Sequence, residues 1–147
     1  MKKLLLALAL LLPLLSVAET PSERKAVFDC SSDDMDFVSS RMWLIAESAK
    51  EYQELKVPYQ FVLTIHSGCT EIMAKESAEE DETIAKIQQR MEELSTKYKV
   101  SVEGCQIAID RYGYAKKDLL PFITPVRNSI TRVINLENEG YALITFD

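Results

Sequence analysis

The 147-residue sequence lacks the short motifs that carry several common chemistries. It has no G-x-G-x-x-G or G-K-[ST] loop for nucleotide phosphates, no G-x-S-x-G turn for a nucleophilic serine and no H-E-x-x-H pair for zinc. A surplus of basic residues is also missing, because 17 lysines and arginines stand against 23 aspartates and glutamates. The acidic balance argues against nucleic acid and anionic lipid as partners, and the missing motifs lower the expectation of an enzyme.

Long apolar runs are absent except at the beginning of the chain. Two lysines precede an apolar run from Leu4 to Leu15, and Ser16 and Ala18 follow as the small residues of a signal-peptidase site. The run contains Pro13 and is short for a membrane span, and no cysteine stands directly after the cleavage site to carry a lipid. We therefore expect a signal peptide over residues 1–18, export to the periplasm and no membrane attachment after cleavage.

Cleavage would leave a short linker, residues 19–24, and a single domain, residues 25–147. Removal of 18 residues from 147 leaves 129, which is enough for one domain with its own core. The two lysines in the removed segment reduce the basic count from 17 to 15 against 23 acids, so the formal charge becomes −8.

Cysteine is scarce, and the count is odd. Cys30, Cys69 and Cys105 are too few for a disulfide scaffold, so the core must hold the fold. Because three cysteines cannot all pair within one chain, at least one is free, modified, bound to metal or paired with another molecule.

Strand and helix patterns alternate along the domain. Apolar, β-prone runs predict five strands: 25–30, 59–66, 100–105, a short one near 122–127 limited by two prolines, and 141–146. Amphipathic spacing, caps and glycines predict helices over 35–55, 77–98, 106–113 and 130–139, the last capped by Asn128 or Ser129, with a short helical piece in 67–73. This order predicts an α/β fold, a parallel sheet with helices on both faces.

The candidate site residues follow the strands. Cys30, His66 and Cys105 end the first three strands, and Cys69 comes three residues after the only histidine. Ligands of open parallel sheets bind at the carboxyl edge, where the helices that follow begin. Each thiol precedes a predicted helical segment, which lowers a thiol pKa from about 8.5 and favours the reactive thiolate. Glu103 and Asp110 would oppose this effect, whereas Arg111 or His66 would support it.

The segments FDCSSDDMDFVSSRMWLI, VPYQFVLTIHSGC, CQIAIDRYG and GYALI together resemble the DsrE/DsrF-like family of sulfur-relay proteins. The resemblance covers nearly all of the mature chain. It implies a three-layer α/β/α fold whose five parallel strands have the order 4-3-2-1-5, and assembly as a homo-oligomer, a trimer or a hexamer. In that order Cys30 and Cys105 lie two strand spacings apart, too far for a disulfide, while Cys69 could reach either.

The resemblance also implies that Cys105 carries sulfane sulfur as a persulfide. From their positions, Cys69 and Cys30 are candidates for supporting thiols. His66, Asp110 and Arg111 are candidates for shaping the site, the last two by positioning an anion such as thiosulfate or polysulfide. We expect no cofactor, and a sulfur donor or acceptor, protein or small compound, as partner. The sequence leaves open whether the chain is a sulfurtransferase or a sulfur carrier.

Two hypotheses from other functional classes stay open. The first is a non-catalytic, oligomeric binding protein whose cysteines are structural, with Phe37, Trp43 and Leu44 suited to subunit contacts. The second is a zinc site formed by the three cysteines and His66, although no C-x₂-C pair is present, and we predict no metal.

Overall fold

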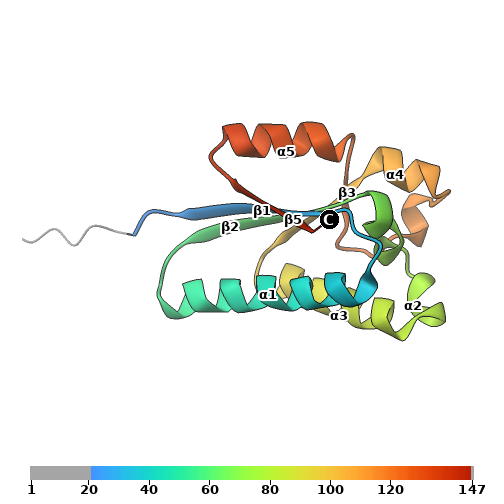
Figure 1. The fold of residues 1–147 in the computed structure, drawn as a ribbon, viewed down its shortest axis with the longest axis horizontal. Helices are drawn as coiled ribbons and strands as arrows, with labels where there is room; N and C mark the ends of the chain where they lie inside the picture. The colour runs from blue at the N-terminus through green and yellow to red at the C-terminus, as the bar shows by residue number, and fades with distance from the viewer. Residues whose placement is uncertain (1–20, 147) are drawn as a thin grey trace, which may run out of the picture.

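The computed structural model describes residues 21–146, and Figure 1 shows one parallel sheet between helices. The predicted signal peptide, residues 1–18, lies outside the described residues. The five strands follow the order β4-β3-β2-β1-β5, and every neighbouring pair is parallel, which confirms the predicted fold class and the implied strand order. The strands are β1 (Arg24–Cys30), β2 (Tyr59–Ile65), β3 (Ser101–Cys105), β4 (Thr124–Val126) and β5 (Ala142–Phe146).

Helices lie on both faces of the sheet and at its carboxyl edge. Figure 1 shows α1 (Met35–Glu54) and α3 (Glu82–Thr96) side by side on one face and α5 (Ser129–Asn138) on the other. The helix α4 (Gln106–Arg111) begins directly after β3. Shorter helical turns complete the chain: η1 (Ser67–Met73), α2 (Ser77–Glu80) and η2 (Lys116–Asp118).

The core is divided unequally between the two faces because two long helices cover one face and a single helix covers the other. The larger cluster includes Met42 of α1, Leu63 of β2 and Met91 of α3, all fully buried. The smaller cluster contains Val27, Val62, Val133 and Leu136. Successive strand residues therefore alternate between the two clusters, as the two-residue period of a strand requires.

The predicted helix over 77–98 is interrupted, so that prediction was wrong in its first turn. Asp81 has an extended backbone, with φ −139° and ψ 116°, and its Oδ1 accepts from the backbone N–H groups of Thr83 and Ile84 at 2.6 and 3.2 Å. An aspartate that caps a helix in this way ends the preceding one. The acids Glu79 and Glu80 thus belong to α2, and α3 begins at Glu82.

The remaining boundaries follow the sequence pattern closely. β4 has three residues, includes Pro125 and lies at the edge of the sheet, where a missing N–H is tolerated. Asn128, not Ser129, caps α5, because Asn128 Oδ1 accepts from Ile130 N at 3.0 Å. Gly113 has φ +78°, the left-handed conformation expected of a glycine after a helix. Within residues 21–146, no helix has the length and apolar character needed to cross a membrane.

Candidate functional site

The carboxyl ends of β1, β2 and β3 bring the candidate residues to one edge of the sheet. Cys30 lies opposite Ile65 in the strand register, and Ile65 lies opposite Gly104. The residues that follow Ile65 and Gly104 are His66 and Cys105. The expectation that the first three strands end at a shared rim therefore agrees with the strand register.

Cys30 and Cys69 form a disulfide with a Cα–Cα distance of 5.8 Å, so neither is a free thiol in this structure. Within residues 21–146, Cys105 is the free cysteine. The pairing is possible because Cys69 lies in η1, beside the end of β1, while β2 separates Cys30 from Cys105. The expectation that each thiol precedes a helix holds only for Cys105, because a loop follows Cys30 and Cys69 lies inside η1.

The disulfide also bears on the zinc hypothesis. Two of the four proposed ligands are consumed as a disulfide, and a disulfide sulfur does not bind zinc as a thiolate does. In the part of the chain that the structure describes, no group of three or more His, Cys, Asp or Glu residues is placed to hold a metal ion.

Cys105 is the N-cap residue of α4, and the residue is 5% exposed. Burial raises the pKa of the Cys105 thiol, but hydrogen bonds from the backbone N–H groups of Ser129, Ala108 and Ile107 and from the Ser129 hydroxyl outweigh it, so the net pKa lies below the usual value. These donors come from the first turns of α4 and α5, where N–H groups have no partner within the helix. The arrangement stabilises the thiolate.

A cavity of about 520 Å³ opens on Cys105. Its wall combines the ends of β2 and β3 with α4 and the beginning of α5. The lining residues are His66, Ser67, Gly68, Cys105, Ile107, Ala108, Arg111, Tyr112, Asn128, Ser129 and Ile130. A small reactant can therefore approach Cys105 from solvent, although little of the sulfur is exposed.

His66 is held in this cavity by Asp29, the penultimate residue of β1. His66 Nε2 lies 3.1 Å from Asp29 Oδ1, and Thr64 Oγ1 donates to the same oxygen at 2.5 Å. The hydrogen bond to Asp29 raises the pKa of His66, burial opposes it, and the negative charges of Asp29 and Cys105 add to the rise. Burial raises the pKa of Asp29, but the bonds from His66 and Thr64 outweigh it and leave the net pKa below its usual range.

The segment between His66 and Cys69 is fixed tightly against the β1–α1 loop. Ser67 has φ +49°, a left-handed conformation that is uncommon for serine, and its Oγ lies 2.9 Å from His66 Nδ1. A Cβ on Gly68 would lie 2.6 Å from the backbone N of Asp33, so only glycine fits there. Tyr112 OH donates to the Ser67 carbonyl at 3.1 Å, which connects this wall to the C-terminal end of α4.

The acidic residues near Cys105 are engaged elsewhere. Glu103 accepts two hydrogen bonds from Arg132 of α5, and Asp110 Oδ1 accepts from Gln106 Nε2 at 2.7 Å. Asp110 does not line the cavity, whereas Arg111 does. Asp29 is a site residue that was not predicted from the sequence. Its position beside Cys30, at the end of a strand that was expected to carry the site, is the signal that could have identified it.

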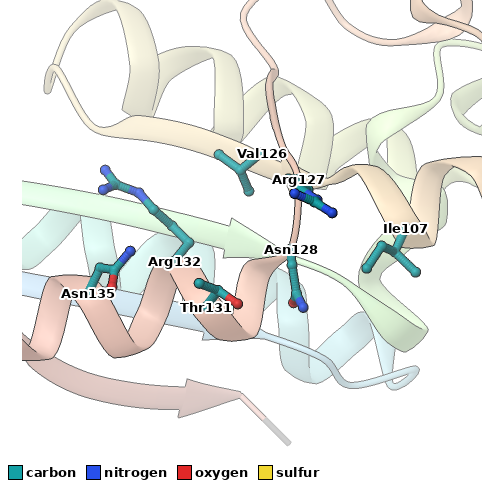
Figure 2. Close-up of a pocket in the computed structure, with 7 residues that line it drawn as sticks. All are labelled: Ile107, Val126, Arg127, Asn128, Thr131, Arg132 and Asn135. Carbon is teal, nitrogen blue, oxygen red and sulfur yellow. The ribbon is translucent and has the colours of Figure 1, made fainter.

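A second cavity of about 480 Å³ adjoins the first and shares Ile107 and Asn128 with it. Figure 2 shows its wall, with Thr131 and Asn135 one helical turn apart along α5 and Arg127 on the segment that leads into this helix. Two arginines, Arg127 and Arg132, line it, but Arg132 is occupied by Glu103.

The chain is similar to a known protein family and to individual proteins. The sequence model of the DsrE/DsrF-like family matches residues 25–146. A protein of Aquifex aeolicus (strain VF5), described as uncharacterized, is 39% identical over 143 residues, 95% of this chain and 62% of that protein. The chain thus spans less than two thirds of that relative's length.

A solved structure is also similar. MTH1491, a protein of unknown function from Methanobacterium thermoautotrophicum, superimposes with a TM-score of 0.70 over 84% of this chain and 99% of that one, at 16% sequence identity. At this identity the likeness shows the shared fold alone.

Proposed function

Because the chain belongs to the DsrE/DsrF-like family, which suggests a role in sulfur relay, we propose that Cys105 accepts sulfane sulfur as a persulfide and passes it to another thiol. The observation that supports this most directly is the position of Cys105. It is the free cysteine of residues 21–146, it borders a cavity, and N–H groups of two helices favour its thiolate.

The proposed transfer needs no external oxidant. The Cys105 thiolate attacks the terminal sulfur of a donor R–S–S⁻; the new bond joins the two sulfurs, the donor S–S bond breaks, and its electron pair leaves with R–S⁻. Transfer to an acceptor thiolate repeats the same exchange in the opposite direction. A thiol with a lowered pKa and an open approach favours both steps.

Intact-mass analysis tests the proposal. Protein treated with polysulfide should gain the mass of one sulfur, and the Cys105→Ser variant should gain none. Cys30→Ser/Cys69→Ser is the matched control because it removes two cysteines and keeps Cys105; it should still gain sulfur. Equal labelling of Cys105→Ser and wild type would end the idea.

We also infer that the protein works outside the cytoplasm, in the periplasm. Support comes from the signal-peptide pattern of the sequence and from the Cys30–Cys69 disulfide, since disulfides persist in oxidising compartments. Fractionation of cells that express the full chain, followed by N-terminal sequencing, tests this inference: an uncleaved protein among cytoplasmic proteins would contradict it.

We further propose that copies of the chain associate through the β5 edge. Leu143 and Ile144 of this edge strand are 40% and 44% exposed, and a cavity of about 240 Å³ separates Ile144 from the exposed Leu44 of α1. Trp43 is exposed as well, whereas Phe37 packs against the core and offers less surface than the sequence suggested. An exposed apolar edge strand favours pairing with another chain.

A further inference from the structure

We propose that Cys105 takes its sulfur from small anionic donors, such as polysulfide or thiosulfate, and that His66 and Arg111 select them by their positive charge. Both side chains line the same cavity as Cys105, His66 from the end of β2 and Arg111 from the last turn of α4. The inference rests on the proposed function, because it names the class of donor for that site.

The positive charges of His66 and Arg111 would offset the repulsion between an anionic donor and the Cys105 thiolate. An anionic donor must approach a thiolate, and two negative charges in a partly enclosed cavity repel each other. The protein as a whole adds to the repulsion, since its formal charge is −6. Cations that face the cavity offset both effects and raise the local concentration of anions.

His66 suits this role by its contacts. Its Nε2 donates to Asp29 Oδ1, and Ser67 Oγ lies at hydrogen-bond distance from Nδ1, so both nitrogens of an imidazolium have an acceptor. Because both ring nitrogens are engaged, the ring stays fixed and acts through its charge. Asp29 is therefore a positioning residue that holds the His66 ring in place and favours its protonated form by raising its pKa.

Arg111 provides the second charge. It is exposed, and in the described part of the chain no carboxylate lies within ion-pair distance of its guanidinium. Its neighbour Asp110 is turned to Gln106 instead. The titratable groups around His66 are then Asp29 from β1, Cys105 from β3 and Arg111 and Tyr112 from α4, while α5 contributes uncharged residues to the cavity.

Alkylation with two reagents of equal size measures the charge preference without sulfur chemistry. Iodoacetate is an anion and iodoacetamide is neutral, and both attack the same thiolate, so the ratio of their rates with Cys105 does not depend on the thiol pKa. We expect this ratio to exceed that of glutathione and to fall roughly two- to fivefold in Arg111→Gln and in His66→Gln. Lys86→Gln, which removes an exposed charge from α3, should leave it unchanged. A ratio equal to that of glutathione, unmoved by either variant, would overturn the proposal.

A pH series separates the charge of His66 from its shape. Asp29→Asn removes the partner that raises the pKa of the His66 ring. The ratio should therefore be lower than in wild type at pH 7 and should match wild type at about pH 5.5, below the ordinary histidine pKa of about 6.5. A ratio that is low at both pH values would contradict the charge role of His66.

A second experiment uses thiosulfate and inorganic polysulfide as sulfur donors and detects the Cys105 persulfide by mass spectrometry. Sulfur uptake should slow in Arg111→Gln and His66→Gln and should decline with added salt in wild type. Uptake that is equal in all variants would refute the donor selection and leave the proposed function intact. If no sulfur is taken up by any form while the alkylation ratio still responds, the proposed function fails and the donor assignment fails with it.

Discussion

Arg132 of α5 binds both carboxylate oxygens of Glu103 on β3, with Nε 2.8 Å from Oε2 and Nη2 3.0 Å from Oε1. Glu103 is 5% exposed and stands two residues before Cys105. The pair connects α5, whose first N–H group donates to the Cys105 sulfur, to the strand that carries this cysteine. The ion pair also neutralises Glu103, the acid that the sequence predicted to oppose the thiolate form of Cys105.

Arg132→Met should lower stability and raise the pKa of Cys105 together. The substitution leaves a buried carboxylate without its partner, which costs about 1–3 kcal/mol at a site that is partly open to water. Urea unfolding measures the first effect, and the pH dependence of alkylation measures the second. The double variant Glu103→Gln/Arg132→Met should regain part of the stability and bring the pKa of Cys105 back toward the wild-type value. A Cys105 pKa that stays as high as in Arg132→Met would show that the ion pair does not couple to the thiol.

Ser129→Ala should raise the pKa of Cys105 because it removes the hydroxyl donor and keeps the backbone N–H of residue 129. The expected rise is below about one unit, since one of several hydrogen bonds is lost. The thiolate absorbance at 240 nm, followed across pH, reports the change. Thr131→Ala, an exposed position two residues further along α5, is the control and should titrate like wild type.

The Asp29–His66 pair should make stability depend on pH at both ends of the range. The raised pKa of His66 contributes stability that is complete below about pH 6.5 and is lost as pH rises through the raised value. The lowered pKa of Asp29 contributes stability that is present above about pH 4 and is lost as pH falls through the lowered value. Thermal unfolding of wild type and His66→Gln between pH 3 and 9 should therefore differ most near pH 5 to 6. A constant difference would argue against a charged pair.

Cys30→Ser/Cys69→Ser should unfold more readily than wild type by about 3–4 kcal/mol, because the disulfide closes a loop with a sequence separation of 39. The same change frees the Ser67–Gly68 wall of the cavity, so alkylation of Cys105 should become faster at fixed pH. Reductant should reproduce both effects in wild type and change nothing in the double variant. An unchanged unfolding midpoint would show that the disulfide adds no stability.

Ile144→Lys should reduce the mass of the protein in solution, because it places a charge in the apolar edge that we propose as the contact between copies. Light scattering at several concentrations measures this mass. Ile134→Lys is the control, since Ile134 is similarly exposed, at 51%, but lies on α5. A wild-type protein that is monomeric at every concentration would refute the association.

The sequence alone determined the fold class and most element boundaries. Period-two runs and three-to-four spacing predicted all five strands and the long helices, because burial on one face requires those spacings. It also determined that Cys105 stands where a strand passes into a helix, which is a local property of VEGC followed by QIAID. The break at Asp81 was missed, since helix-favouring residues surround it and only the cap geometry reveals the interruption.

The tertiary structure decided the contacts. The disulfide partner of Cys30, the approach of Asp29 to His66 and the pairing of Glu103 with Arg132 each join residues that lie 29 to 39 positions apart. Such pairs depend on strand order and on how a helix packs across the sheet, which hydrophobic spacing does not encode. The sequence therefore shows which charged residues stand near Cys105. Only the folded chain decides whether each of them points toward the sulfur, where it stabilises or opposes the thiolate, or away from it.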